Sequence, residues 1–423
     1  MIPPQTETSG VVSPLVIPRP GHRISRSDID KDALKVLYRL HRHGHIAYLV
    51  GGGVRDLLLK RKPKDFDIST SAHPNEIKKL FANCRLIGRR FRLAHIYFRG
   101  NKIIEVSTFR TSSEFDLEDG PITSDNTFGT PVEDSFRRDF TVNALFYNIS
   151  DFTVIDYVNG LNDLHDRVVR IIGDPFVRFE EDPIRILRGV RFAALLDFTL
   201  DPASQKAIRS MKDQIWQGAT PRILEEIFRM FGRGKGRNAF ALLRKLGLLE
   251  TLFPEVYHHI KAEGADEYMG ILSRLDASFR KGKELTPSLI LSTIYYPLCK
   301  RATARDPRGD KIQIVRETIT PLAERIQVPR KVQDTMRQTI AAQTRLLGLK
   351  SRKFRPKTIL QKSYFPGAME LFELTAGGDN EGRKLITEWK KMGSNFSRNP
   401  AANTQKSRKR RRRDPTKRKN RPS

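Results

Sequence analysis

Short strand-like runs alternate with helical patterns in the first part of this chain, and from Asp182 onward the strand signal vanishes. Apolar runs bounded by turn residues predict strands, and apolar residues repeated every three or four positions predict amphipathic helices. The chain is therefore predicted to be α+β, with a mixed α and β part up to about residue 150 and mostly helices beyond it. The predicted strands cover residues 46–50, 66–69, 94–98, 102–109 and 153–157, and the predicted helices of the first part cover 28–44, 54–59, 74–81 and 133–147.

Three segments have the composition of loops or tails. Residues 1–27 are rich in Pro, Ser and Thr and are predicted to be a flexible leader. Residues 111–131 form a long polar stretch, and a loop of this length inside a domain is usually functional or disordered. Residues 394–423 contain almost no apolar residues and are predicted to be a disordered basic tail.

The net charge of the chain is strongly positive. It has 77 Lys and Arg against 48 Asp and Glu, a formal net charge of +29. Because such an excess repels itself unless a polyanion neutralises it, nucleic acid is the expected partner. The alternative is a highly soluble basic protein. The charge is not confined to the tail, since residues 401–423 account for only part of it.

The composition argues against membrane and disulfide-rich classes. No stretch approaches the roughly 18 uninterrupted apolar residues of a membrane-spanning helix. The first 20 residues lack the pattern of a signal peptide, so a reducing cytoplasm is the expected location. The two cysteines, Cys84 and Cys299, exclude a disulfide framework and a cysteine-rich zinc site.

A glycine turn between a predicted strand and helix is the first candidate site. Leu49-Val50-Gly51-Gly52-Gly53-Val54-Arg55-Asp56 lets the backbone approach a ligand, and a helix N-terminus favours anions. Arg55 could add a charged fork for phosphate. The segment is neither a Walker loop nor a dinucleotide fingerprint. An ordinary tight turn is the alternative.

Three acidic residues follow on predicted strands. Asp65 and Asp67 project from the same face of a strand, because side chains two residues apart do so. Neighbouring carboxylates repel unless a cation lies between them, and oxygen ligands suit Mg²⁺. Glu105 lies in the otherwise apolar run Ile103-Ile104-Glu105-Val106. It is expected either to pair with Arg110 or Arg55, or to face a metal.

The order of these features resembles the DNA polymerase beta-like nucleotidyltransferases. Later segments resemble the class II group, which contains tRNA CCA-adding enzymes and bacterial poly(A) polymerases. The resemblance runs from about His22 to Pro254. The segments that carry it are Arg137-Arg138-Asp139-Phe140-Thr141-Val142-Asn143-Ala144-Leu145, then Asp156 through Gly160 to Asp163-Leu164, and Glu181-Asp182-Pro183-Ile184-Arg185.

The resemblance implies roles for individual residues. Asp65, Asp67 and Glu105 would be catalytic, and Asp65 and Asp67 would bind two Mg²⁺. Asp139 and Asn143 would hold the ribose of the nucleotide. Asp182 and Arg185 would read the base. The full nucleotide-binding set would be Gly52, Gly53, Arg55, Arg138, Asp139, Asn143, Asp182, Arg185 and Arg188.

Most of these residues also have a purely structural interpretation. Asp182 before Pro183 is a helix N-cap pattern. Arg137 and Arg138 could be solvated helix charges, and Asn143 could lie on a helix surface. His95 is expected to be structural rather than catalytic.

One segment distinguishes the two enzymes of the group. Leu86-Ile87-Gly88-Arg89-Arg90-Phe91-Arg92-Leu93-Ala94-His95-Ile96 resembles the form typical of bacterial poly(A) polymerases. The arginines could hold a triphosphate or the RNA 3′ end. Alternatives are a CCA-adding tRNA nucleotidyltransferase and a non-catalytic RNA-binding protein.

The expected function is polynucleotide adenylyl transfer from ATP to RNA 3′ ends, with two Mg²⁺ and release of pyrophosphate. The expected domains are a nucleotidyltransferase head with a small mixed sheet (28–160), a helical neck that binds base and RNA (161–275) and a helical body (276–393). No membrane is involved in this hypothesis. The sequence leaves protein partners, such as RNA-decay or RNA-chaperone proteins, unspecified.

Overall fold

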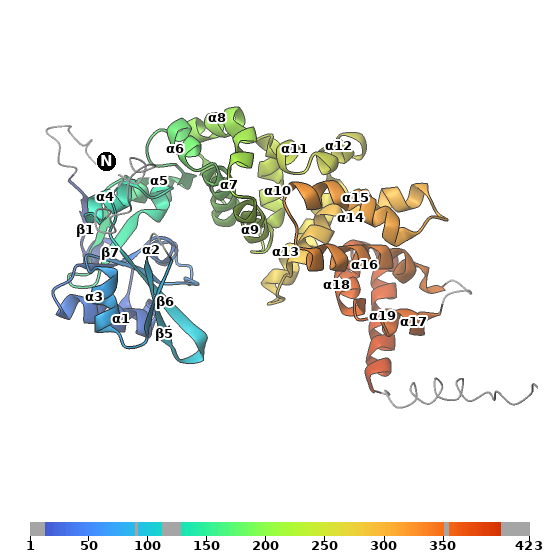
Figure 1. Cartoon of the computed structure of the whole chain (residues 1–423), viewed down its shortest axis with the longest axis horizontal. Coiled ribbons are helices and arrows are strands. Elements are labelled where there is room, and N and C mark those ends of the chain that lie inside the picture. The colour runs from blue at the N-terminus through green and yellow to red at the C-terminus, as the bar shows by residue number, and fades with distance from the viewer. Residues whose placement is uncertain (1–12, 89–91, 112–127, 351–354, 399–423) are drawn as a thin grey trace, which may run out of the picture. The chain divides into compact units, whose positions relative to one another are not determined.

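The computed structural model describes residues 13–88, 92–111, 128–350 and 355–398. The chain divides into two compact units, Met1–Ala219 and Thr220–Ser423 (Figure 1). This division falls inside the range predicted for a neck. Within the described ranges no helix has the length and apolar character needed to cross a membrane.

The first unit is built on one eight-stranded mixed sheet. Its strand order is β1-β8-β7-β2-β3-β6-β5-β4, and all neighbouring strands are antiparallel except β3 and β6, which are parallel. This confirms the predicted small mixed sheet of an α+β head. The strands are β1 (Leu15–Ile17), β2 (Ala47–Val50), β3 (Asp67–Thr70), β4 (Cys84–Ile87), β5 (Leu93–Phe98), β6 (Lys102–Thr108), β7 (Leu145–Asn148) and β8 (Val154–Asp156).

Helices pack against this sheet and connect its strands. The helix α1 (Lys31–Arg42) packs on β2 and β3, and α3 (Pro74–Leu80) packs on β4 and β5. The apolar stripe of α1 is buried, as its spacing predicts. The helix α2 (Gly52–Leu58) follows β2 directly and contacts β2 and β7.

The remaining elements of the first unit are short helices and one small two-stranded sheet. The helix α7 carries more buried apolar side chains than any other element of this part and packs on β9, β10 and η5. The elements are η1 (Arg19–Gly21), η2 (Arg26–Asp28), η3 (Arg99–Asn101), α4 (Pro131–Phe136), η4 (Thr141–Asn143), α5 (Gly160–Asp166), β9 (Val168–Val169), α6 (Pro175–Glu181), α7 (Ile184–Leu196), β10 (Thr199–Leu200), α8 (Pro202–Met211) and η5 (Lys212–Gln217).

The second unit is entirely helical in its described residues. Its longest buried helix, α14, packs against α12, α13, α15, α16 and α18. Trp389 is fully buried, and its indole N–H donates to the Leu346 carbonyl at 2.9 Å. The helices are α9 (Thr220–Phe231), α10 (Gly236–Lys245), α11 (Leu248–Leu252), α12 (Pro254–Glu263), α13 (Asp266–Arg280), α14 (Pro287–Arg305), α15 (Lys311–Arg325), α16 (Arg330–Leu347), η6 (Gly348–Lys350), α17 (Pro356–Leu360), α18 (Phe365–Ala376) and α19 (Asn380–Arg398).

Two predictions about chain ends are corrected by the structure. Part of the predicted flexible leader is ordered, because Leu15–Ile17 forms the edge strand β1 and pairs with β8. A three-residue strand has too little pattern to be recognised. The predicted disordered tail begins too early at residue 394, because α19 continues to Arg398. Its earlier turns are anchored in the core by Leu385 and Trp389.

The predicted helix over residues 133–147 is wrong. The segment contains α4, the 3₁₀ turn η4 and then β7, which pairs with β2 and β8. The strand β7, with its aromatic residues, pairs with one neighbouring strand on each side, and this tertiary pairing decides its conformation. The strand β4 was also missed, as were the short β9 and β10.

We expect Gly160→Ala to lower the free energy of unfolding by about 3 kcal/mol, as overpacking against rigid backbone does. A Cβ at Gly160 would lie 2.2 Å from the Thr141 carbonyl oxygen, so either α5 or η4 must move. Urea unfolding measures the effect. Gly348→Ala is the matched control, because a Cβ there meets nothing within 4 Å. Equal stability of the two variants would contradict the prediction.

Candidate active site

Two of the three predicted catalytic acids lie on adjacent parallel strands. In the β3–β6 register, Ile68 pairs with Val106, so Asp67 and Glu105 occupy neighbouring positions one residue earlier. Residues two apart on a strand share a face, so Ser69 and Ser107 lie on the same face as these acids. Their hydroxyl oxygens are 3.0 Å apart, which agrees with this placement.

The carboxylates of this edge interact electrostatically. Asp67 is exposed to solvent, but desolvation by the surrounding protein and then the charges of Glu105 and Asp65 raise its pKa to about 6, while Arg138 acts in the opposite direction. The structure therefore places Asp67 within electrostatic reach of both Glu105 and Asp65. They do not form a preformed metal cage, since the described residues contain no group of three or more metal-ligating side chains.

Glu105 contacts a histidine rather than Arg55. His95 stands opposite Glu105 in the β5–β6 register, and its Nε2 lies 3.4 Å from Oε2 of Glu105. The hydrogen bonds of Arg55 go to Asp56 and Asn143 instead. The half-exposed Glu105 carboxylate thus keeps one side toward solvent.

The glycine turn is confirmed as the link between β2 and α2. Gly51 has a φ of 69° and a ψ of −134°, a conformation that glycine adopts without strain. The predicted phosphate-binding residues Gly52 and Gly53 form the first positions of α2. Gly51, which sets the direction of the turn, was not among the predicted site residues.

Arg55 connects two predicted motifs. The side chain is buried, with Nε and Nη2 donating to Asp56 and Nη1 donating to Oδ1 of Asn143 at 2.5 Å. Asn143 is itself buried in η4, so the alternative of a helix-surface position is wrong. The arginine therefore fixes the predicted ribose-binding turn against the glycine turn.

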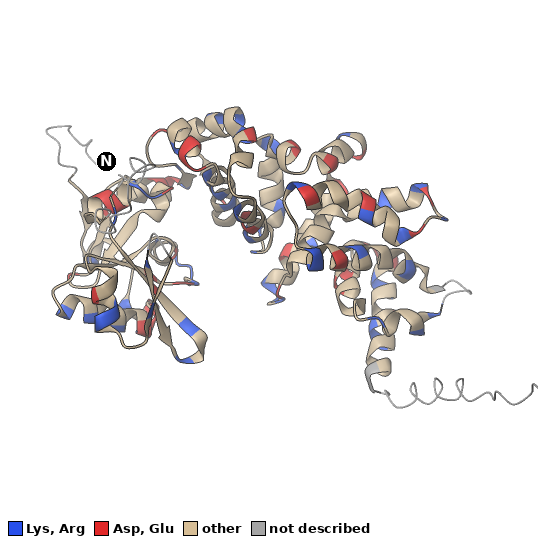
Figure 2. Ribbon diagram, in the orientation of Figure 1, with Lys and Arg blue, Asp and Glu red and all other residues tan. Residues whose placement is uncertain are grey.

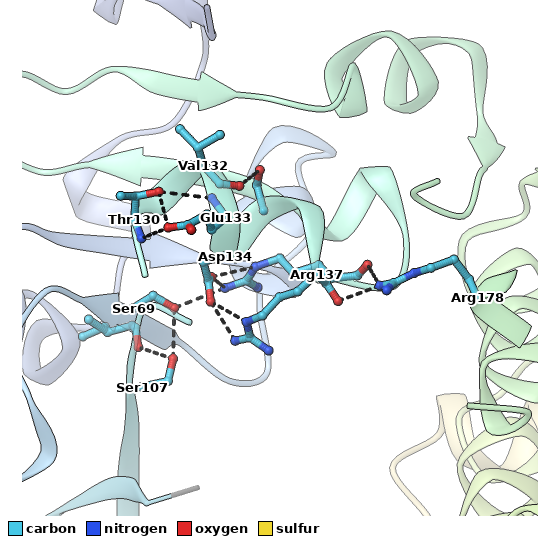
Figure 3. Close-up of polar contacts among 11 residues, drawn as sticks. Ser69, Ser107, Thr130, Val132, Glu133, Asp134, Arg137 and Arg178 are labelled. Atoms are coloured by element: carbon cyan, nitrogen blue, oxygen red, sulfur yellow. Dashed lines mark hydrogen bonds and ion pairs between the residues drawn. The ribbon is translucent and has the colours of Figure 1, made fainter. Parts of the chain in front are cut away.

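Arg138 lies over the acidic face of the sheet. Its Nη2 donates to Oγ of Ser69 at 3.1 Å and to Oδ2 of Asp134 at 2.7 Å. Arg137 pairs with the same Asp134 at 2.7 Å. The alternative that Arg137 and Arg138 are solvated helix charges is therefore wrong. Figure 3 shows this network.

Asp139 and Arg188 form an ion pair. Nε of Arg188 donates to Oδ2 of Asp139 at 2.7 Å, and the backbone N–H of Phe140 donates to Oδ1 at 2.9 Å. Burial alone would raise the pKa of Asp139, but Arg188 and this hydrogen bond hold it below its usual value. The pair joins the segment before η4 to α7.

Asp182 and Arg185 lie at the junction of α6 and α7. Asp182 accepts a hydrogen bond from the N–H of Ile184 at 3.3 Å, so it contributes to capping while Pro183 is the N-cap. Nη1 of Arg185 donates to Glu181 at 2.6 Å and to the Arg178 carbonyl at 2.8 Å.

Other motif residues have structural contacts. Asp156 accepts the N–H groups of Val158, Gly160 and Leu161 at the start of α5. Asp163 accepts the Thr141 hydroxyl at 2.7 Å. In the discriminating segment 86–96, residues 89–91, with Arg89 and Arg90, lie outside the described residues, as do residues 112–127 of the polar loop and the tail 399–423.

The sequence reasoning missed Asp134 and Arg178. Asp134 is fully buried and binds two arginines. Arg178 donates to the carbonyls of Arg137 and Arg138 at 2.7 and 2.9 Å. A buried acid three residues before an arginine pair has no signal that separates it from a surface acid, because its burial depends on tertiary packing.

A mixed sheet with acids on two adjacent parallel strands, a glycine turn beside them and a helical remainder defines a nucleotidyltransferase. Comparison with known families agrees. Residues 47–170 match the poly A polymerase head domain. Residues 197–259 match the probable RNA and SrmB-binding site of polymerase A, and residues 313–423 match the polymerase A arginine-rich C-terminus. The chain belongs to the bacterial poly(A) polymerase family, within the class II group of nucleotidyltransferases.

Individual relatives place the chain more closely. It is 38% identical over 396 residues to poly(A) polymerase I of Salmonella typhi, covering 88% of this chain and 84% of that one. It is 39% identical over 221 residues to a CCA-adding enzyme of Lactobacillus gasseri, covering 52% and 54%. In fold it resembles the Bacillus stearothermophilus CCA-adding enzyme solved with CTP, with a TM-score of 0.66 at 23% identity over 86% of this chain and 82% of that one.

Proposed function

We propose that this enzyme transfers AMP from ATP to the 3′ ends of RNA. The observation that carries the proposal is the cluster of Asp65, Asp67 and Glu105 beside Arg138 in a poly(A) polymerase head. The 3′ oxygen of RNA bonds to the α-phosphorus of ATP, and the bond from that phosphorus to the bridging oxygen of the β-phosphate breaks. The hydroxyl proton is lost to solvent, and pyrophosphate leaves.

The chemistry of the acids fits Mg²⁺. The carboxylates are oxygen ligands, and Mg²⁺ is usually held by one or two of them together with substrate phosphates and water. Asp65 and Asp67 would hold two ions, and Glu105 would complete the acidic set. Bound Mg²⁺ would lower the pKa of the RNA 3′-hydroxyl and neutralise charge on the triphosphate. Repulsion among the acids favours a cation at this edge.

The nucleotide-binding roles are proposed for residues that the fold holds near each other. Gly52, Gly53 and Arg138 would contact the phosphates, with Arg55 fixing the turn through Asn143. Asp139 remains able to accept a ribose hydroxyl while Arg188 neutralises it, because a carboxylate has about four lone-pair positions. Asp182 and Arg185 would select adenine.

The positive charge supports RNA as the second substrate. Lys and Arg occur on the helices and strands of both units (Figure 2). Phosphate contacts from such residues bind nucleic acid without reading its sequence. The basic tail would add to this binding, and the cytoplasm is the proposed location.

A CCA-adding activity is the second candidate. The Lactobacillus gasseri relative is a CCA-adding enzyme, and its similarity covers about half of each chain. The same acids would serve that reaction, but CTP would also be a substrate and tRNA the acceptor.

We expect ATP alone to extend an unstructured RNA by many residues when Mg²⁺ is present. CTP, GTP and UTP, each supplied separately, should give little extension because the base contacts would select adenine. Gel electrophoresis of a 5′-labelled RNA measures product length. A requirement for tRNA, with a product that stops after C-C-A, would favour the second candidate.

A further inference from the structure

Asp134 is a fully buried carboxylate that separates two arginines. Its Oδ1 accepts from Arg137, with Nε at 2.9 Å and Nη2 at 2.7 Å. Its Oδ2 accepts from Arg138, with Nε at 3.1 Å and Nη2 at 2.7 Å. Burial by itself would raise the pKa of Asp134, but the two guanidinium charges hold it below its usual value. The carboxylate is therefore charged, and both of its oxygens accept hydrogen bonds from these two arginines.

The backbone that carries the arginines is fixed as well. The helix α4 begins with a capping box in which Thr130 and Glu133 bond to each other's backbone N–H groups. After the helix, Arg178 donates to the carbonyls of Arg137 and Arg138 (Figure 3). The position of Arg138 is thus determined at both its backbone and its side chain.

Ser69 is the second anchor of the Arg138 guanidinium. Nη2 of Arg138 donates to its hydroxyl at 3.1 Å, and Ser69 lies two residues after Asp67 on the same face of β3. A Cβ at Gly51 would lie 3.5 Å from Nη1 of Arg138. The guanidinium consequently stands between the glycine turn and the acidic edge.

We propose that Asp134 is a positioning residue which, with Ser69, holds the Arg138 guanidinium at the glycine turn so that it binds the triphosphate of ATP. The inference rests on the proposed function. An arginine this close to Asp67 would otherwise pair with the acids, which attract it. Asp134 accepts hydrogen bonds from Nε and Nη2 of Arg138. Nη1 of Arg138 is left facing the glycine turn.

The test is the dissociation constant of ATP, measured by calorimetry on the full chain, together with KM and kcat for AMP incorporation. We expect Asp134→Asn to weaken ATP binding roughly tenfold, the size of one lost charged hydrogen bond, with a smaller change in kcat. In an Arg138→Ala background the same substitution should change ATP binding by less than about twofold, because its effect acts through Arg138.

Asp201→Asn is the matched control. Asp201 is also a buried acid near an arginine, with Arg170 at 3.7 Å, and it caps α8 far in sequence from Arg138. Asp201→Asn should change the dissociation constant of ATP by the same factor in the wild-type and Arg138→Ala backgrounds. Ser69→Ala, which removes only a hydroxyl, should weaken ATP binding roughly threefold, an effect that also disappears in the Arg138→Ala background.

The outcomes separate this inference from the proposed function. Equal fold-changes for Asp134→Asn in both backgrounds, or unchanged ATP binding, would overturn the positioning role while wild-type activity stands. If Asp134→Asn does not fold, the Ser69→Ala cycle decides in the same way. A wild-type protein that neither binds ATP nor incorporates AMP would instead overturn the proposed function.

Discussion

Asp67→Asn is expected to lower the rate of AMP transfer by at least about a thousandfold. Metal-assisted charge stabilisation contributes several kcal/mol to such reactions, and each 1.36 kcal/mol is a factor of ten. Asn keeps the shape of the side chain but cannot supply a charged oxygen ligand. Single-turnover assays at saturating ATP and RNA measure the effect. Asp166→Asn, at an exposed acid at the end of α5, should retain activity.

The same substitution is expected to stabilise the metal-free protein above about pH 6. The pKa of Asp67 is about 6, above its ordinary value of 3.8, through desolvation and then the charges of Glu105 and Asp65. Between these pH values the native state binds more protons than the unfolded state, so stability falls as pH rises from about 4 to about 6. The asparagine of Asp67→Asn does not titrate, so the variant lacks this loss of stability. Because solvent screens the exposed Asp67, the gain is on the order of 1 kcal/mol.

Thermal unfolding in EDTA at pH 4 and pH 7 tests this second effect. The difference between Asp67→Asn and wild type should be larger at pH 7. Substantial transfer activity in Asp67→Asn would contradict the catalytic role of Asp67. A variant that is less stable than wild type at pH 7 would contradict the placement of Asp67 in a repelling acidic cluster.

Asp139→Asn is expected to lower the free energy of unfolding by about 3 kcal/mol and to abolish most activity. Breaking such a pair removes the carboxylate that faces the partner's charge. Here the partner is Arg188 of α7, which is only one-third exposed. The loss should be greatest near neutral pH and shrink in acid, because the pKa of Asp139 in the folded protein is held below its usual value. Urea unfolding and steady-state kinetics measure the two effects.

The double variant Asp139→Asn with Arg188→Gln supplies the control. Removing the cation as well should recover part of the lost stability, because a pair of neutral groups no longer holds a positive charge without the Asp139 carboxylate. It should not recover activity if Asp139 contacts the ribose. If the stability losses of the two single variants add up to the loss of the double variant, the two side chains are not coupled.

The acidic edge was predictable because its residues have local patterns. Asp67 and Glu105 stand out as charges in strand-like runs and lie on β3 and β6, whereas Asp65 lies just before β3 rather than on the strand. The charges of Glu105 and Asp65 both act on Asp67. The glycine turn was predictable for a similar reason, since few other residues permit such a bend. The mixed sheet followed from the alternation of short apolar runs with helical ones.

The supports of the site were not predictable in the same way. Ser69 and Arg178 contact the arginine pair from segments far apart in the chain, and a single sequence gives no measure of such distances. Asp134 contacts arginines only three and four residues further on, but its burial cannot be read from the sequence. The strand β7 was mistaken for helix because its pairing with β2 and β8 lies outside any local window. Glu105 was expected either to pair with an arginine or to face a metal, and the β5–β6 register that sets His95 opposite it was not foreseen.

The pairing of β1 with β8 sets an order for folding during synthesis. Roughly 140 residues separate the two strands, and a ribosome adds about 5–20 residues per second, so β1 waits on the order of 10 s for its partner. The strands that carry the acids, β3 and β6, are complete earlier. During this interval β3 and β6 can already pair with each other, while the backbone N–H and C=O groups of β1 still lack their partners on β8. A chaperone that binds exposed extended segments would therefore find Leu15–Ile17 unpaired until β8 leaves the ribosome and covers it.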